Sequence, residues 1–134
     1  MTTISSKYLG TLRTESIHDQ SGTKLVTDAP KDNRGKGESF SPTDLTATAL
    51  GTCMVTTMAI KANDLGVDMG NITFNTQKIM AAGPRRIETI RVRIEWENPQ
   101  GTPEQQETLK AAALNCPVGL SLHPNLKQDV TFNF

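Results

Sequence analysis

The sequence predicts an α+β fold in which a long helix and a second helix pack against antiparallel sheets of short strands. Two patterns predict the core of it: a helix-forming stretch with no further proline from Pro42 to Gly66, and an apolar–charged alternation of period two from Ile90 to Trp96. Short alternating segments near both ends of the chain supply the other strands. At 134 residues the chain can bury a core, and we expect one domain over residues 1–134.

The N-terminal region alternates in two short segments, residues 8–13 and residues 23–27. The polar stretch 19–22 between them ends in a glycine and suits a turn, so an antiparallel meander is expected here. Residues 28–40 are rich in proline, glycine and lysine, which predicts a long loop leading to the first helix.

The long helix has a start signal and a stop signal. Ser41 suits the N-cap, Pro42 the first helical position, and Asp44, three residues after the cap, completes a capping-box pattern. Gly66 offers the residue type that adopts the left-handed conformation after a helix. The helix therefore begins at Ser41-Pro42 and ends before Gly66.

A hairpin follows, with one strand over residues 72–80, a break at 81–84 and a second strand at 90–96. The second strand has apolar residues on one face and Arg91, Arg93, Glu95 and Glu97 on the other, as a half-buried strand does. We interpret the arginines as a solvated or cross-strand paired face rather than an anion site.

Two further helix starts are predicted in the last third of the chain. Thr102-Pro103 starts a second helix that runs to about Asn115, and Cys116-Pro117 starts a short helical segment that reaches Leu122. Residues 130–134 alternate again and should form an edge or terminal strand.

Composition excludes several classes of partner. Fourteen Lys and Arg balance fourteen Asp and Glu, so there is no basic stripe for nucleic acid and no polybasic membrane segment. No stretch is expected to provide the roughly 20 apolar residues that span a bilayer, and the N-terminus lacks a secretory signal pattern. We therefore expect a cytoplasmic protein, with neither nucleic acid nor membrane as a partner.

The two cysteines are the candidate chemical groups. Cys53 lies in the middle of the long helix, where a free cysteine is most often a small core residue. Cys116 directly precedes Pro117 and could occupy the N-cap of the short helix, where N–H groups and the helix dipole favour a thiolate. In a reducing compartment such a pair is more often catalytic, redox-active or metal-binding than a permanent disulfide.

A metal or nucleotide cofactor is not expected. His18 and His123 with the two cysteines supply enough ligand types for zinc, but neither a Cys-x-x-Cys nor a His-x-x-x-His spacing occurs. The glycines of residues 33–37 lack the preceding strand and the spacing of a phosphate loop.

Two cysteine contexts carry a resemblance to a known family. Ser-Pro-Thr-Asp-Leu upstream of Cys53, the small-residue helix between them, and Asn-Cys-Pro-Val around Cys116 resemble the OsmC/Ohr family of osmotically induced and organic hydroperoxide resistance proteins. The resemblance runs along nearly the whole chain and is to a less characterised OsmC-like branch. It implies the OsmC-like fold and an intertwined homodimer.

The resemblance also implies roles for individual residues. Cys53 matches the peroxidatic cysteine and Cys116 the resolving cysteine, while Arg13 best matches the active-site arginine and Arg34 is the second candidate. Well-characterised peroxidase members place a glutamate directly after the Ser-Pro or Asn-Pro, where this chain has Thr43. Asp44, one residue later, matches the acidic position of less characterised branches.

Helix geometry constrains Asp44. It lies nine residues before Cys53, on nearly the opposite helix face and about 13.5 Å away along the axis. Unless Asp44 is only a cap, it must act on an arginine brought to it from elsewhere, most simply at a symmetric dimer interface with two shared sites.

The expected activity is thiol-dependent reduction of a hydroperoxide. Cys53 would become a sulfenic acid, Cys116 would condense with it to a disulfide, and an external dithiol, by resemblance a lipoylated protein, would restore both thiols. Apolar residues on the Cys53 face of the helix favour an organic peroxide. The alternatives are a non-catalytic or redox-sensing protein of the same fold, and a structural role with both cysteines inert.

Overall fold

The structure is a computed structural model, and it describes residues 3–134. The chain divides into two compact units, Met1–Leu45 and Thr46–Phe134. The boundary lies in the first turn of helix α1 (Pro42–Leu65). The single domain expected over residues 1–134 stays a prediction.

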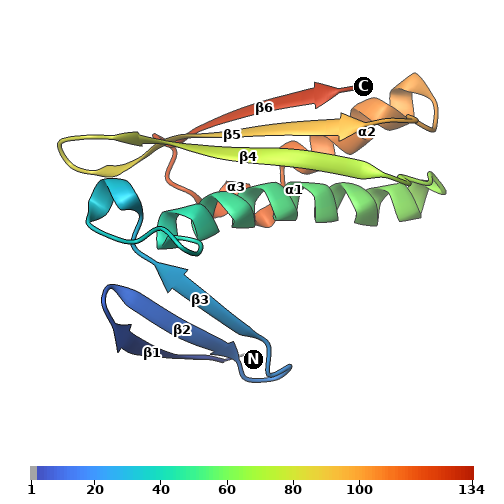
Figure 1. The fold of residues 1–134 in the computed structure, drawn as a ribbon. Coiled ribbons are helices and arrows are strands. Elements are labelled where there is room, and N and C mark those ends of the chain that lie inside the picture. The colour runs from blue at the N-terminus through green and yellow to red at the C-terminus, as the bar shows by residue number, and fades with distance from the viewer. Residues whose placement is uncertain (1–2) are drawn as a thin grey trace. The chain divides into compact units, whose positions relative to one another are not determined.

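The first unit contains a three-stranded meander of β1 (Ile4–Gly10), β2 (Arg13–His18) and β3 (Lys24–Asp28), followed by a 3-10 helix, η1 (Lys31–Asn33) (Figure 1). Both strand pairs are antiparallel, in the order β1-β2-β3. The predicted N-terminal meander is therefore confirmed.

The boundaries predicted for that meander were wrong at one point. Residues 8–13 do not form one strand, because the chain reverses between β1 and β2. The turn uses three successive residues with positive φ: Gly10 at 85°, Thr11 at 53° and Leu12 at 63°. Threonine and leucine rarely adopt this conformation, so only Gly10 carried a turn signal.

Helix α1 begins at Pro42 and ends at Leu65, as its cap residues predict. Gly66 follows with φ of 69°, the left-handed conformation expected after a helix. One expectation fails here: by length and composition α1 is apolar enough to cross a membrane. Core helices of globular proteins meet the same criterion, and α1 buries Leu50, Met54 and Met58 completely.

The second unit contains a sheet of β4 (Ile72–Ala81), β5 (Arg86–Trp96) and β6 (Lys127–Asn133). The β4–β5 hairpin is antiparallel as predicted, but β6 pairs parallel to β5, so the expectation of purely antiparallel sheets is wrong. The reason is the connection, since α2 (Pro103–Leu114) and α3 (Pro117–Ser121) carry the chain back before β6 begins. The predicted position of β6 at the sheet edge is confirmed.

One face of this sheet is apolar and packs with the helices (Figure 1). Ile90, Val92 and Ile94 of β5 are fully buried, as their alternation predicts. Gly51 lets α1 approach β4 closely: a Cβ there would lie 2.5 Å from Thr76 Oγ1. The other face is polar, and Arg91 donates to Asp129 at 2.9 Å and to Gln77 at 3.3 Å, which confirms the cross-strand interpretation.

Candidate active site

Cys53 lies in the middle of α1 and is half-buried. Its side chain packs against the hydrophobic core formed by its neighbours on the helix and by the sheet. Its carbonyl oxygen accepts a hydrogen bond from the Thr57 hydroxyl at 2.7 Å, a bond that does not involve the sulfur. The thiol is therefore on the edge of the core and not sealed within it.

Cys116 is the N-cap of α3, as the sequence predicts, and is fully buried. Its Sγ accepts a hydrogen bond from the Gly119 N–H at 3.4 Å, and Pro117 occupies the first helical position. The cap holds the thiol at a defined place between the short helix and the core.

The two thiols interact with each other. Burial raises the pKa of Cys116, and a hydrogen bond with Cys53 and the charge of Cys53 raise it further, while the N–H groups of Gly119 and Val118 lower it. These effects of Cys53 act only at short range, and both side chains pack in the same hydrophobic cluster of the unit Thr46–Phe134, so the two thiols lie near each other. The structure therefore brings together the two cysteines that the sequence singled out.

The expectation that the helix start would favour a Cys116 thiolate does not hold. The N–H groups act in the predicted direction, but burial has the larger effect on the pKa. Cys116 thus stays a neutral thiol beside the more exposed Cys53.

Gln128 is a residue of this region that the sequence reasoning missed. It lies on β6, and its Nε2 donates to the Gly119 carbonyl at 2.9 Å. A Cβ on Gly119 would meet Gln128 Oε1 at 3.0 Å and Cys116 Sγ at 3.4 Å, so a side chain there would require the Gln128 amide to shift. The available signal was a glutamine in the apolar alternation of the last strand.

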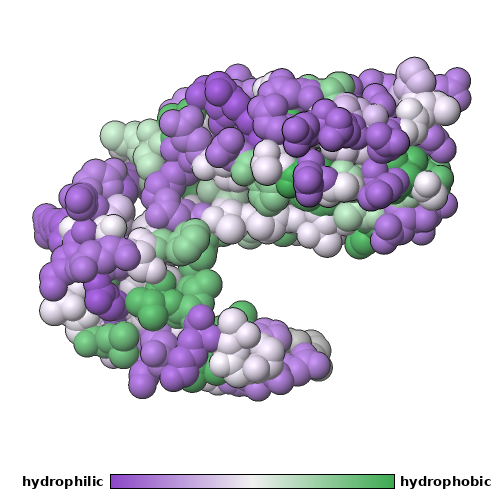
Figure 2. Space-filling view, turned by 45° about the vertical axis from the view of Figure 1, so that its right-hand side comes forward, coloured by the Kyte–Doolittle hydropathy of each residue, from purple (hydrophilic) through white to green (hydrophobic). Residues whose placement is uncertain are grey.

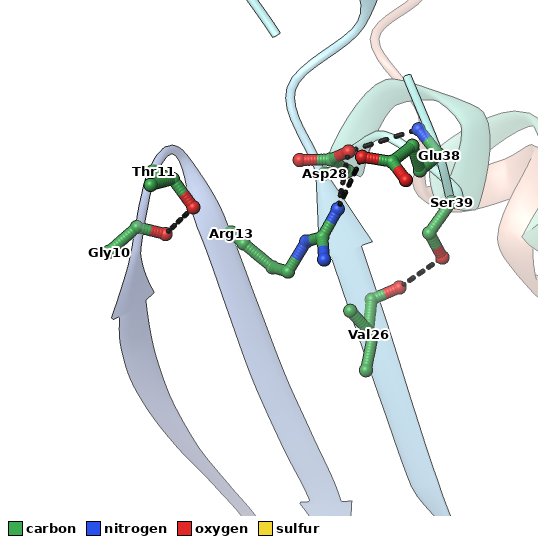
Figure 3. A network of polar contacts seen from close by, with 7 residues as sticks. All are labelled: Gly10, Thr11, Arg13, Val26, Asp28, Glu38 and Ser39. Atoms are coloured by element: carbon green, nitrogen blue, oxygen red, sulfur yellow. Dashed lines mark hydrogen bonds and ion pairs between the residues drawn. The ribbon is translucent and has the colours of Figure 1, made fainter. Parts of the chain in front are cut away.

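Arg13 lies on β2 and is paired with two carboxylates. Its Nη2 donates to Asp28 Oδ2 at 3.1 Å and to Glu38 Oε1 at 3.3 Å (Figure 3). The hydrogen bond and charge of Asp28, followed by those of Glu38, raise the pKa of Arg13. The guanidinium is therefore a permanent cation held at one of its two terminal nitrogens.

Asp28 is the second residue that the sequence reasoning missed. It ends β3 and is fully buried, and its Oδ2 also accepts the Glu38 backbone N–H at 3.0 Å. That N–H, and then the Arg13 side chain, lower the pKa of Asp28 below its usual range. The sequence placed Asp28 at the start of a loop, with no pattern linking it to Arg13 fifteen residues earlier.

Asp44 and Arg34 are both placed by local structure. Asp44 Oδ2 accepts the Ser41 N–H at 2.9 Å and Ser41 Oγ accepts the Asp44 N–H at 3.1 Å, which confirms the predicted capping box. Arg34 follows η1 with φ of 68°. Arg13, Arg34 and Asp44 belong to Met1–Leu45 and the cysteines to Thr46–Phe134, so the contact of an arginine with Cys53 stays a prediction.

Within residues 3–134, no group of three His, Cys, Asp or Glu side chains could hold a metal ion. The two histidines bond to nearby residues of the chain: His18, the last residue of β2, bonds Ser21 Oγ through Nδ1 at 2.6 Å, and His123 Nδ1 accepts the Asn125 N–H at 3.0 Å. The chemistry offered by this part of the chain is that of thiols and a guanidinium.

Known proteins resemble the chain in sequence and in fold. A family model described as OsmC-like protein matches residues 35–131. No curated protein matches the chain. A crystal structure from Psychrobacter arcticus, of a protein provisionally described as an osmotic stress induced and detoxification response protein, is 45% identical with a TM-score of 0.92, covering 99% of this chain and 96% of that one.

More distant structures share the fold. An organic hydroperoxide resistance protein OsmC from Legionella pneumophila is 16% identical with a TM-score of 0.80, over 100% of this chain and 97% of its own. An organic hydroperoxide resistance protein from Elizabethkingia anophelis, with thiocyanate bound, is 18% identical with a TM-score of 0.73, over 98% and 96%.

Proposed function

The chain belongs to the OsmC-like protein family, and from this membership we propose that it is a cysteine-based peroxidase that reduces organic hydroperoxides. Structures of the same fold include proteins named for organic hydroperoxide resistance. The single observation that carries the proposal is the contact between Cys53 and Cys116, because a peroxidase that resolves through a disulfide needs two neighbouring sulfurs.

The proposed reaction has three steps. The Cys53 thiolate attacks the outer peroxide oxygen and the O–O bond breaks, giving a sulfenic acid and an alkoxide that takes up a proton to become the alcohol. The Cys116 sulfur then attacks the Cys53 sulfur, forming the disulfide and releasing water. An external dithiol, for which a lipoylated protein is our candidate, exchanges with the disulfide, becomes oxidised itself and returns both thiols.

Each residue has a distinct part in this scheme. Cys53 is the nucleophile because it is the more exposed of the two thiols. Cys116 is the resolving thiol, kept neutral by burial until the sulfenic acid forms beside it. Arg13 is the cation that would stabilise the Cys53 thiolate and the departing oxygen, since its charge cannot be titrated away at neutral pH. The part of Asp44 would be to orient such a cation in addition to capping α1.

We further propose that the working form is an intertwined homodimer with two shared sites. Apolar side chains of the unit Met1–Leu45 support this, because Ile4, Tyr8 and Phe40 are 65%, 66% and 51% exposed. Figure 2 shows apolar side chains gathered on one side of this unit, in the lower part of the view. A three-stranded sheet needs an apolar face covered to be stable, and a second copy of the chain would cover it. Sedimentation as a monomer at micromolar concentration would remove this proposal.

The second candidate function is a redox sensor of the same fold that oxidises but does not turn over. It is favoured by Thr43, which stands where well-characterised peroxidase members have a glutamate. A sensor would consume one equivalent of peroxide per site and stop, even with a dithiol present.

Turnover separates these two functions. The protein is mixed with tert-butyl hydroperoxide and excess dihydrolipoamide, and peroxide consumption is followed over many equivalents. Continuous consumption that depends on both cysteines supports the peroxidase, consumption that ends at one equivalent supports the sensor, and none at all overturns both. Hydrogen peroxide in parallel tests the expected preference for organic peroxides, which equal rates would contradict.

A further inference from the structure

We propose that Asp28 is the positioning residue that holds the Arg13 guanidinium in its working orientation. Asp28 would act through Arg13 and would not touch the peroxide. The inference rests on the proposed function, because it assigns to this chain the carboxylate that its Thr43 does not supply.

The two residues are opposite each other in the antiparallel β2–β3 pair, where Arg13 is the register partner of Asp28. Directly opposite residues of neighbouring strands have close Cβ atoms, so the ladder keeps the Arg13 guanidinium within reach of the carboxylate. The result is the 3.1 Å bond between Nη2 and Oδ2 (Figure 3). The contact is thus set by backbone pairing and does not depend on a flexible loop.

Asp28 is itself held at two further points. Its backbone N–H donates to the Phe40 carbonyl at 3.0 Å, and its Oδ2 accepts the Glu38 backbone N–H at 3.0 Å. The side chain has no exposed area. A buried carboxylate is tolerated when it is paired with a cation, and removal of that cation leaves an uncompensated charge. Burial of Asp28 therefore favours arginine conformations that keep Nη2 on Oδ2.

The Glu38 carboxylate binds Arg13 Nη2 more weakly than Asp28 does. Its side chain is 61% exposed and its contact to Arg13 Nη2 is longer, 3.3 Å. Exposed pairs contribute little because water and salt screen them and two long side chains must be ordered. Glu38 supports the network mainly through its backbone N–H, which any residue except proline would supply.

The pair keeps hydrogen-bonding capacity for a further group. Within the described residues, Arg13 Nε and Asp28 Oδ1 are buried and have no hydrogen-bond partner. Buried polar atoms without partners are uncommon in folded proteins. An arginine anchored through Nη2 alone can present its other N–H groups to a thiolate or a peroxide oxygen, as the proposed function requires.

Asp44, the acidic residue that the sequence favoured, has a different position. Its Oδ2 accepts the Ser41 N–H at the start of α1, whereas Asp28 Oδ2 accepts directly from the guanidinium. The observed contact thus assigns the anchoring of Arg13 Nη2 to Asp28, and the part proposed for Asp44 would be additional to it.

Four variants test the proposal: Asp28→Asn, the matched control Glu38→Gln, Arg13→Lys, and Arg13→Lys with Asp28→Asn. The measurement is the second-order rate constant for oxidation of Cys53 by tert-butyl hydroperoxide in a single turnover, read by alkylation and mass spectrometry. We expect Asp28→Asn to slow it about tenfold or more, the usual cost of losing a positioning partner, and Glu38→Gln to change it less than about twofold.

A purely structural role is separated by the double variant. If Asp28 acts by orienting the planar guanidinium of Arg13, Asp28→Asn has almost no further effect on the rate in the Arg13→Lys background. A rate loss that is equal in both backgrounds, or an Asp28→Asn rate within twofold of wild type, would overturn the proposal. If Asp28→Asn does not fold, Arg13→Lys alone tests the proposal. Lysine keeps a cation beside Asp28 but lacks the planar guanidinium, so a wild-type rate would show that an oriented guanidinium is not needed.

The same series distinguishes failure of this inference from failure of the proposed function. A wild-type protein whose Cys53 does not react with the peroxide would overturn both. A reactive wild type with an unchanged Asp28→Asn rate would overturn only the role of Asp28.

Discussion

The two compact units of the chain are stabilised in opposite ways. Every member of the described hydrophobic cluster comes from Thr46–Phe134, where α1 and the β4-β5-β6 sheet bury it. In the described part of Met1–Leu45, the buried residues are instead polar: Thr27, Asp28 and Ser41. One unit is held by apolar burial and the other is organised by hydrogen bonds and one buried ion pair.

This difference assigns the parts of the proposed chemistry. The unit with the apolar core holds the two sulfurs in fixed relation, as a disulfide step requires. The unit with the polar interior holds a cation whose direction depends on a carboxylate. Substitutions in the two units should therefore have different effects. The chain has one tryptophan and one tyrosine, and each reports on one unit: Trp96 on Thr46–Phe134 and Tyr8 on Met1–Leu45.

The largest expected effect is that of Cys53→Ser, which removes the nucleophile. We expect peroxide consumption to fall about a thousandfold or more, because a serine hydroxyl is not ionised at neutral pH. Cys116→Ser serves as the comparison: it should still give one equivalent of Cys53 sulfenic acid, trapped by dimedone. Equal residual activity in Cys53→Ser and wild type would contradict the assignment.

The next largest effect is on the stability of Thr46–Phe134, the unit with the apolar core. Leu50 is fully buried on α1, and Leu50→Ala should lower the free energy of unfolding by about 2–5 kcal/mol through the cavity it leaves. Leu120→Ala, at a residue that is 71% exposed, is the control and should change it by less than about 0.5 kcal/mol. Urea unfolding followed by Trp96 fluorescence measures both, and equal losses would show that the core is not where the structure places it.

Selective alkylation tests the unequal environments of the thiols. Burial raises the pKa of Cys116, so the stability that the neutral thiol contributes is fully present below the unfolded pKa and is lost as pH rises from there through the folded pKa. At pH 7.5, iodoacetamide should label Cys53 at least about tenfold faster than Cys116 in the folded protein, since the thiolate is the reactive form. In urea the two rates should converge, and equal rates in the folded protein would contradict the assigned burial.

The smallest expected effect is a loss of stability of the unit Met1–Leu45 at low pH. The Glu38 N–H, and then Arg13, lower the pKa of Asp28, so the stability this carboxylate contributes is present above its unfolded pKa, about 3.9, and is lost as pH falls through the folded value. Tyr8 should report this change first, because its hydroxyl accepts the Leu12 N–H at 3.2 Å in the β1–β2 turn. In Asp28→Asn the Tyr8 signal should depend less on pH below 4, and an unchanged dependence would exclude Asp28 as the titrating group.

Short sequence patterns were enough to predict helix ends and the buried face of a strand. The bounds of α1 follow from Ser41, Pro42 and Gly66, and the buried face of β5 follows from its alternation. The N-cap position of Cys116 followed from the proline after it. These features depend on residues within one or two turns or on a period of two.

Other features escaped because they depend on distant partners or on the balance of opposing effects. The parallel pairing of β6 is decided by the path through α2 and α3, and the Arg13–Asp28 pair by strand register across fifteen residues. The elevated pKa of Cys116 required knowing that burial outweighs the hydrogen bond from Gly119. Neither the pairing partner of a strand nor the depth at which a single thiol is buried follows from a short sequence pattern.

Peptide mapping of the oxidised protein tests most directly whether Cys53 and Cys116 form one redox pair. The protein is treated with one equivalent of organic hydroperoxide, blocked, digested without reduction and examined by mass spectrometry. We expect an intrachain Cys53–Cys116 disulfide as the main product. Recovery of both cysteines as free thiols, or of Cys53 in a disulfide with any other sulfur, would contradict it.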